Sequence, residues 1–374
     1  MKLLFLDTKP IRRGAQVFVD DLSQHFHNDS ISIKKVYLYA YNETVKLNLL
    51  KQDTELNGNE NHFFEKIPTV HPALLINLIR IINAWNPDFV LLNGSRTLKY
   101  GAAAKPFLKK NTKLIYRIID SPKFWNRSIL KQSYYRKLIL PKIDAAIGVS
   151  QSSLNDMIAL HGYNKPTTVI HRAIQENKFI NVPSKESCRL KFNVKSTDKV
   201  LLFLGNLTPQ KRPDRFVEII KSVKQHFPEI KAWIVGDGVL LQKTQTLVLN
   251  YNLHNNITFW GYQQNVNEII AASDLLVLCS DTEGLPGVVL ECGYLGVPTV
   301  SANVGGINEC LENEITGYVV QTQNPEDYAN YIIELMNNEE TRKSMGELSM
   351  KKIKSGFTMD MVANKYLAFF NSLK

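Results

Sequence analysis

Short apolar runs alternate along the chain with segments in which apolar residues recur every three or four positions. This alternation predicts buried parallel strands joined by crossover helices, the pattern of an α/β protein. The clearest helix is Pro72–Trp85, and a proline at position 87 prevents it from continuing. Strands are predicted at 2–6, 33–39, 89–92, 113–118, 145–149 and 167–170, and then at 200–204, 231–235, 257–259, 275–278, 299–301 and 318–320.

A polar segment without periodicity at 182–186 interrupts this alternation, which then restarts. The pattern therefore predicts two Rossmann-like, doubly wound α/β domains that face a central cleft. The N-terminal domain is expected over residues 1–183 and the C-terminal domain over 184–355, with a final helix in 356–374 that packs back on the N-terminal domain. Because ligands of open parallel sheets bind at the carboxyl ends of the strands, the chemistry is expected in the cleft.

Composition narrows the class of protein. With 374 residues, of which 44% are hydrophobic and 21% charged, the chain can bury a sizeable core, so disorder is excluded. Its four cysteines form no C-x-x-C pair, so neither a disulfide framework nor a zinc site is expected. Asn77 and Arg80 interrupt the most apolar segment, and Asp7 ends the first apolar run early. A cytoplasmic protein without a membrane span or export signal is therefore expected.

Charge is distributed unevenly. Residues 1–183 carry a net charge of +12 and residues 184–374 carry −2, and the segment 96–142 holds thirteen basic residues with one acid, Asp120. A helix from about position 128 would place apolar side chains beside cations: Leu130, Tyr134 and Leu138 with Lys131 and Lys137. This predicts contact with an anionic membrane surface, and a merely solvated basic face remains the alternative. Nucleic acid is not an expected partner, because no recognised binding module accompanies the charge.

Two glutamates stand eight positions apart after the strand at 275–278. Pro286 is placed like a first-turn helix proline, so Glu283 falls in the strand-to-helix loop and Glu291 in the second helical turn. Amides at a helix start attract phosphate, and a carboxylate in the next turn can accept hydrogen bonds from the two vicinal hydroxyls of a ribose. A capping role for Glu283 and a solvated position for Glu291 remain alternatives.

Two further loops follow strands of the C-terminal domain. The loop at 205–212 carries Lys211, the cation expected to meet a diphosphate, although a solvated surface lysine is the alternative. The pair Gly305 and Gly306 would let the backbone approach a ligand closely, or would form an ordinary tight turn.

These segments together resemble the retaining glycosyltransferases of family 4, which have the two-lobed GT-B fold. The resemblance extends over nearly the whole chain and rests on Arg13-Gly14-Ala15, the G-x-L-x-x-x-K loop at 205–211, Val235-Gly236-Asp237-Gly238, and the E-x7-E element with its trailing Gly296-Val297-Pro298. It implies a hexosyltransferase that moves a sugar from a nucleotide-sugar donor to a lipid-linked or cell-surface polysaccharide acceptor. A non-catalytic sugar-nucleotide-binding subunit of a glycosylation complex is the alternative.

The resemblance also implies roles for individual residues. Glu291 would hold the donor ribose and Lys211 the donor diphosphate. Glu283, which is the expected catalytic residue, would contact the donor sugar together with the backbone of Gly284, Leu285 and Pro286. Gly14, in the N-terminal domain, would lie against the donor phosphate or the acceptor.

Three positions depart from the family pattern. Asn206 stands where many members have an arginine, so Arg212 or Arg172 would have to supply the second cation. Ile119 stands where a catalytic histidine is often found, which leaves that role to Asp120 or to no side chain. In place of a base, the departing phosphate can take the acceptor's proton, and catalysis then rests on charge stabilisation and positioning. The sequence contains no Asp-x-Asp, so a metal-independent reaction without a cofactor is expected.

Overall fold

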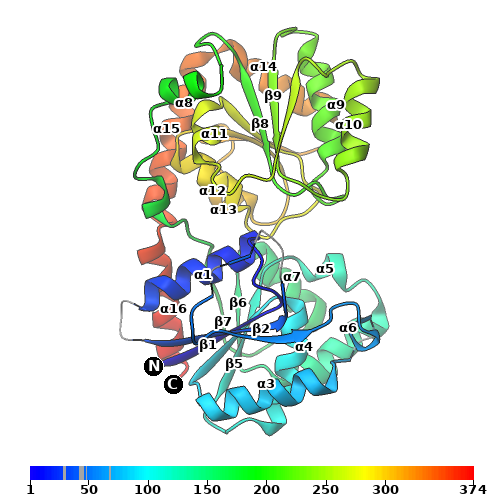
Figure 1. The fold of residues 1–374 in the computed structure, drawn as a ribbon, viewed down its shortest axis with the longest axis vertical. Helices are drawn as coiled ribbons and strands as arrows, with labels where there is room; N and C mark the ends of the chain where they lie inside the picture. Colours follow the sequence, from blue (N-terminus) through cyan, green and yellow to red (C-terminus); the bar gives the residue numbers. More distant parts are fainter. Residues whose placement is uncertain (28–30, 42–45, 48, 67–68) are drawn as a thin grey trace. The chain divides into compact units, whose positions relative to one another are not determined.

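The computed structural model describes residues 1–27, 31–41, 46–47, 49–66 and 69–374. The chain folds into two compact units, each built on a parallel sheet (Figure 1). The first unit contains residues 1–173 and 359–374, and the second contains 174–358. The two Rossmann-like sheets that the sequence predicts are confirmed, and each predicted strand is present within a few residues of its expected bounds.

The sheet of the first unit has seven strands in the order β3-β2-β1-β4-β5-β6-β7. Their bounds are β1 Lys2–Asp7, β2 Ser32–Tyr39, β3 Thr54–Gly58, β4 Phe89–Asn93, β5 Lys113–Ile118, β6 Ala145–Gly148 and β7 Thr167–Val169. Strand β3 is not predicted from the sequence. It is a short, polar, half-exposed strand at the edge of the sheet, so it has no run of apolar residues by which to recognise it.

Helices cover both faces of this sheet. Leu4 and Leu6 of β1 pack on one face with apolar side chains of α3 and α4, whereas Leu3 and Phe5 pack on the other with α1 and α16. Successive strand residues point to opposite faces, so one buried strand serves both layers. The helices of this unit are α1 Gly14–His27, α2 Phe63–Lys66, α3 Pro72–Trp85, α4 Ser95–Ala104, α5 Pro122–Trp125, α6 Ile129–Tyr134, α7 Gln151–His161 and α16 Met359–Ser372.

Helix α16, from the end of the chain, is held to the first sheet by a buried arginine. Arg117 on β5 donates from Nε to the Tyr366 hydroxyl at 3.1 Å and from Nη1 to Asn93 Oδ1 at 2.9 Å. Its guanidinium also lies 4.4 Å from the centre of the Phe18 ring of α1. A buried charge requires such partners, so these contacts join α1, β5 and α16.

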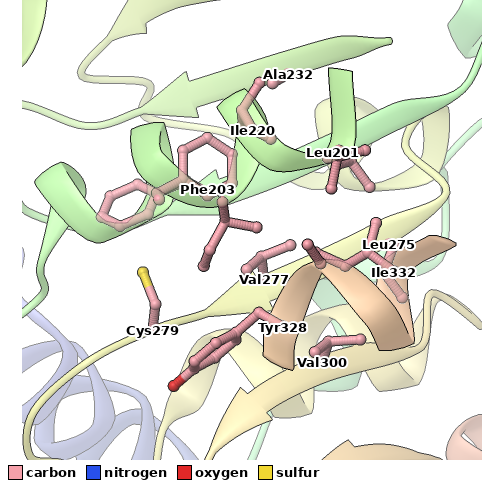
Figure 2. Close-up of a cluster of buried hydrophobic side chains, with 14 of the residues drawn as sticks. Leu201, Phe203, Ile220, Ala232, Leu275, Val277, Cys279, Val300, Tyr328 and Ile332 are labelled. Atoms are coloured by element: carbon pink, nitrogen blue, oxygen red, sulfur yellow. The ribbon is translucent and has the colours of Figure 1, made fainter. Parts of the chain in front are cut away.

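The second unit has six strands in the order β10-β9-β8-β11-β12-β13. The strands are β8 Val200–Leu204, β9 Lys231–Val235, β10 Ile257–Gly261, β11 Leu275–Leu278, β12 Thr299–Ala302 and β13 Gly317–Val320. The helices are α8 Lys185–Lys191, α9 Pro213–Lys224, α10 Leu241–Asn250, α11 Asn267–Ala272, α12 Gly287–Tyr294, α13 Ile307–Cys310, α14 Pro325–Asn337 and α15 Glu339–Gly356. Figure 2 shows the core of this unit, where Phe203, Ile220 and Ile332 from β8, α9 and α14 meet. Burying each such side chain contributes about 1.5–3 kcal/mol.

The boundary between the units differs from the one predicted. Residues 174–183, expected in the N-terminal domain, belong to the second unit. The ring of Phe179 lies 4.8 Å from that of Tyr294, and the Lys178 carbonyl accepts a hydrogen bond from Asn267 Nδ2 at 2.6 Å. The polar composition of 182–186 marks an exposed loop and the start of α8 rather than the place where the chain passes between units.

Two expectations from composition concern the cysteines and the membrane. All four cysteines are buried free thiols. Within the described residues, the helices are too short or too polar to serve as membrane spans.

Candidate functional site

The order of strands in the second sheet reverses between β8 and β11, which are neighbours in the sheet although two strands intervene in sequence. Loops that leave adjacent strands in opposite directions open a crevice at the carboxyl edge of the sheet. The loop after β8 carries Asn206, Lys211 and Arg212, and the loop after β11 carries Glu283. The sequence therefore places its candidate residues at the position where an open α/β sheet binds ligands.

Lys211 and Glu283 meet across this point. Lys211 Nζ lies 2.5 Å from Glu283 Oε1, and Ser280 Oγ donates to the same oxygen at 2.7 Å. Glu283 is 7% exposed and the Lys211 side chain 24% exposed. A buried carboxylate is thus paired with a cation that stays partly accessible, and an anion could approach the ammonium from solvent. Glu283 does not cap α12, since Pro286 is the N-cap residue.

The Glu283 loop is positioned by a glycine pair. Gly305 has a φ of +55°, and a Cβ there would lie 1.9 Å from the Glu283 carbonyl oxygen. Gly306 then donates its amide to the Gly284 carbonyl at 2.7 Å. The pair forms the tight turn that the sequence left open, in which the Ile307 amide donates to the Val304 carbonyl at 3.2 Å, and it also lies close to the Glu283 loop. Its approach to a ligand stays a prediction.

The Lys211 loop is tied both to its neighbouring strand and to the Glu283 loop. The Leu207 amide donates to the Asp237 carbonyl at 2.9 Å, and a Cβ on Gly236 would lie 2.0 Å from the Gly205 carbonyl oxygen. Gln210 Nε2 donates to the Thr282 carbonyl at 2.9 Å, and the Asp281 amide donates to the Gln210 carbonyl at 2.9 Å. These reciprocal bonds fix the separation of the two loops.

Helix α12 begins just after the Glu283 loop. Gly284, Leu285 and Pro286 are buried and lead directly into the helix, and Glu291 lies half-buried in its second turn, as predicted. Since no side chain among the described residues caps this helix, its first amides are available to an anion. Gly296, whose φ is +73°, follows the C-terminal end of the helix.

Arg212, on the same loop, pairs with two carboxylates and, like Lys211, stays partly accessible, with 29% of its side chain exposed. It donates to Asp214 from Nε and Nη2, the latter at 2.9 Å, and from Nη1 to Asp281 at 3.3 Å. The hydrogen bond to Asp214 raises the pKa of the guanidinium, and the charges of Asp214 and Asp281 raise it further. Asp214 and Asp281 thus balance the positive charge of Arg212. Asn206, where many family members have an arginine, is exposed on the same loop.

The remaining candidate residues lie in the first unit. Gly14 begins α1, and a Cβ there would lie 2.7 Å from Arg172 Nη1, so these two predicted residues are neighbours. Asp120 follows β5 and accepts a hydrogen bond from Trp125 Nε1 at 3.2 Å. Burial raises the pKa of Asp120, so its protonated form is favoured relative to that of a free aspartate.

Sequence reasoning missed other polar residues near these positions. Gln210 supports the Glu283 loop through a contact between distant segments, whereas Ser280 bonds to Glu283 locally, three residues away. In the first unit, Asp7 at the end of β1 accepts hydrogen bonds from Gln16 and Asn93. An acid that ends an otherwise apolar strand is the one signal that could have marked Asp7.

Two parallel sheets, with an ion pair and an uncapped helix start at a strand-order reversal, define an α/β protein that can bind an anionic ligand beside hydroxyl groups. Two family models match: "Glycosyltransferase Family 4" over residues 12–178 and "Glycosyl transferases group 1" over residues 184–352. Since the matches together extend over nearly the whole chain, the protein belongs to the family 4 glycosyltransferases.

Individual relatives agree with this assignment. The N-acetyl-alpha-D-glucosaminyl L-malate synthase of Bacillus anthracis is 28% identical over 60% of this chain, and the match spans 58% of that relative's length. The UDP-Gal:alpha-D-GlcNAc-diphosphoundecaprenol alpha-1,3-galactosyltransferase of Escherichia coli is 26% identical over 71% of this chain and 69% of its own.

Solved structures share the fold. The crystal structure of Anabaena HepE in complex with UDP and glucose has a TM-score of 0.83 at 19% identity, over 100% of both chains. Sucrose-phosphate synthase from Thermosynechococcus elongatus has a TM-score of 0.87 at 15% identity, over 100% of this chain and 99% of the other. The predicted GT-B fold is confirmed.

Proposed function

We propose that this protein transfers a hexosyl group, with retention of anomeric configuration, from a nucleotide-sugar donor to a lipid-linked or cell-surface polysaccharide acceptor. The observation that carries the proposal is the Lys211–Glu283 pair, joined at 2.5 Å where the strand order reverses and directly before α12. The names of the relatives support it, since one is a galactosyltransferase acting on a diphosphoundecaprenol-linked sugar and another is a poly(ribitol-phosphate) N-acetylglucosaminyltransferase.

In this proposal the second unit holds the donor. Lys211 binds the diphosphate from its accessible side, and the start of α12 adds backbone amides. Glu291 accepts hydrogen bonds from the ribose hydroxyls, and Glu283 contacts the transferred sugar beside the backbone of Gly284. Arg212, which Asp214 and Asp281 orient on the same loop, is the second proposed cation for the diphosphate.

The reaction then balances without a separate base. The bond between the anomeric carbon and the diphosphate oxygen breaks, and the acceptor hydroxyl oxygen bonds to the anomeric carbon on the same face. The hydroxyl proton passes to the departing diphosphate, whose negative charge Lys211 stabilises. Gly14, Arg172 and Asp120 are proposed to position the acceptor, and no metal ion takes part.

Replacing the two donor contacts tests the site. A thermal-shift screen with UDP-, GDP-, ADP- and CMP-sugars first identifies the donor, since a ligand that binds only the folded state raises its stability. Initial rates with that donor are then expected to fall roughly 10 to 100-fold in Lys211→Ala and in Glu291→Ala, the loss of one charge-assisted hydrogen bond.

Controls separate donor binding from folding. Lys211→Ala leaves Glu283 buried without its cation, so Lys211→Gln is measured beside it, and Lys343→Ala removes an exposed lysine of α15. Equal rates in wild type, Lys211→Gln and Glu291→Ala would refute the site.

Donor binding without any product across an acceptor panel would instead indicate a binding subunit. Activity lost in EDTA and restored by Mg²⁺ would refute metal independence.

We also propose that the protein lies peripherally on an anionic membrane surface through residues 96–142, on the cytoplasmic side. Support comes from apolar side chains that remain exposed among the cations: Phe124 is 44%, Ile129 82%, Leu130 83% and Leu138 55% exposed. Exposed leucine and isoleucine side chains beside arginine and lysine suit the boundary between headgroups and acyl chains. Such a surface would bring the enzyme to a lipid-linked acceptor.

A further inference from the structure

The first unit contains a cavity that the proposed donor site does not use. Its volume is about 580 Å³, and its lining comes from the segments that follow β3, β4 and β5. It therefore opens at the carboxyl edge of the sheet, the edge at which parallel α/β sheets bind ligands. The lining residues are Glu65, Ser95, Arg96, Lys99, Trp125, Ser128, Leu130, Lys131, Tyr134 and Tyr135, and we call this the Lys99 cavity.

Three cations line the Lys99 cavity, and none of them forms an ion pair with a carboxylate of the described residues. Lys99 Nζ donates to the Thr69 carbonyl at 3.3 Å and Lys131 Nζ to the Trp125 carbonyl at 2.5 Å, while Arg96 lies 5.6 Å from the centre of the Tyr39 ring. Burial lowers the pKa of Lys99, and the charges of Arg96 and Lys131 lower it further against the opposing effect of Glu65. The three charges thus repel one another, and a bound anion would relieve that repulsion.

A buried carboxylate also lines the cavity. Glu65 is 6% exposed, and its Oε1 accepts a hydrogen bond from the Tyr100 hydroxyl. Its Oε2 is buried and has no hydrogen-bond partner among the described residues. A buried acceptor without a partner is costly, and a ligand hydroxyl would satisfy it.

Aromatic rings complete the wall. The rings of Trp125 and Tyr135 pack edge to face at 5.1 Å, and those of Tyr134 and Tyr135 at 5.6 Å. Lys131 Nζ lies 5.2 Å from the centre of the Trp125 ring, so cation and aromatic surface are adjacent. Flat apolar surface next to a hydroxyl acceptor and to cations matches a ligand with a sugar ring, a hydroxyl and a charged group.

We propose that the Lys99 cavity binds a sugar that carries a phosphate group. Arg96, Lys99 and Lys131 hold the phosphate, Glu65 accepts a sugar hydroxyl, and the sugar ring packs on Trp125. This inference rests on the proposed function and names its acceptor class as a glycosyl phosphate. Leu130 lies at the lining and is 83% exposed, so an apolar chain attached to the phosphate would find a surface beside the cavity.

Calorimetric titration with four probes tests the chemistry. N-acetylglucosamine 1-phosphate is expected to bind, and N-acetylglucosamine and inorganic phosphate alone to bind at least 10-fold more weakly. N-acetylglucosamine linked through a diphosphate to a short prenyl chain distinguishes the sources: tighter binding than the soluble sugar phosphate indicates a lipid carrier, and equal binding indicates a free sugar phosphate. Absence of binding by both phosphorylated sugars would overturn the proposal, as would equal binding of inorganic phosphate.

Variants locate the binding. Lys99→Gln and Lys131→Gln are expected to weaken N-acetylglucosamine 1-phosphate binding at least 10-fold, and Glu65→Gln to weaken the sugar phosphate but not inorganic phosphate. Lys137→Gln, an exposed cation of the neighbouring helical turn outside the cavity, is the matched control. If Lys137→Gln weakens binding as much as Lys99→Gln, the interaction is general attraction to positive charge and the cavity is not the site.

The donor assay separates this inference from the proposed function. Lys99→Gln is expected to leave donor-induced thermal stabilisation unchanged, and Lys211→Ala to leave sugar-phosphate binding unchanged. A protein that binds the donor but no phosphorylated sugar overturns the Lys99 cavity proposal alone. A protein that binds the sugar phosphate but no nucleotide sugar overturns the proposed donor site alone.

Discussion

Gly305 holds the Glu283 loop at a separation that a side chain would prevent. In Gly305→Ala, the new Cβ would lie 1.9 Å from the Glu283 carbonyl oxygen, at a φ of +55° that disfavours alanine. The loop must shift, so we expect the transfer rate to fall at least 10-fold as Glu283 leaves its place beside Lys211. Initial rates measure the loss of transfer activity, and urea unfolding measures the loss of stability.

Gly261→Ala is the matched control for this prediction. Gly261 has a similar φ of +63°, but no atom lies within 4 Å of a Cβ built there. It should therefore show only the conformational cost of about 1 kcal/mol, with an unchanged transfer rate. Equal effects of the two substitutions on rate would mean that contact with the Glu283 loop is unimportant.

His161 makes stability depend on pH. It is 3% exposed in the last turn of α7, and burial, assisted by the charge of Arg136, lowers its pKa to about 4. The unfolded chain binds a proton near pH 6.5, whereas the folded chain does not. The free energy of unfolding is therefore expected to be highest above pH 6.5 and to fall by about 2–3 kcal/mol as the pH approaches 4.

Urea unfolding at several pH values measures this dependence. His161→Gln should flatten the curve between pH 6.5 and 4, and His254→Gln, at an exposed position, should leave it as steep as in the wild type. An unchanged slope in His161→Gln would assign the acid sensitivity to other groups.

The sequence predicts the chemistry of single residues better than their partners. Lys211 and Glu283 are found from motif and spacing, because each loop follows a predictable strand. Their direct pairing, and the support from Gln210, depend on contacts between segments 72 residues apart. The contacts of Arg212 with Asp214, two residues away, and with Asp281 were likewise not predicted.

At the scale of an element, α16 depends on Arg117. In Tyr366→Phe, the guanidinium loses the hydroxyl that accepts from Nε at 3.1 Å, while it stays buried. We expect the free energy of unfolding to fall by about 1–3 kcal/mol, the cost of a buried donor without a partner. Asn371→Ala, on the exposed side of the same helix, should change it little. Urea unfolding of the wild type and the two variants measures these changes. A Tyr366→Phe variant as stable as the wild type would show that apolar packing alone holds α16.

Strands were predictable wherever both faces are buried, because β1 and β8 then read as continuous apolar runs. Strand β3 was not, because an edge strand of sequence Thr-Glu-Leu-Asn-Gly obtains its pairing from β2 rather than from its own side chains. The helix expected from about position 128 forms as α6 and then continues as a π-helical segment, Tyr135–Ile139. Local periodicity carries no information about that change in hydrogen bonding.

At the scale of the whole molecule, the charge asymmetry predicts binding to lipid. We expect sedimentation with vesicles of equal parts phosphatidylglycerol and phosphatidylcholine, and release as salt shortens the range of the attraction. The double variants Arg127→Gln/Lys137→Gln and Ile129→Ser/Leu138→Ser should each reduce the bound fraction several-fold. Lys343→Gln/Lys351→Gln removes two exposed cations of α15 and should leave the bound fraction unchanged. Equal losses in all three variants would contradict a localised membrane surface.

The first unit is assembled from both ends of the described chain, since residues 359–374 join 1–173. During synthesis on the ribosome, the sheet β1–β7 therefore emerges long before α16, which covers Leu3, Phe5 and Phe89 on one of its faces. The second unit is continuous in sequence and can fold before the first unit is completed by α16. A released chain truncated after residue 358 would thus have a complete second unit and an incomplete first, with the apolar face around Leu3, Phe5 and Phe89 exposed to chaperones.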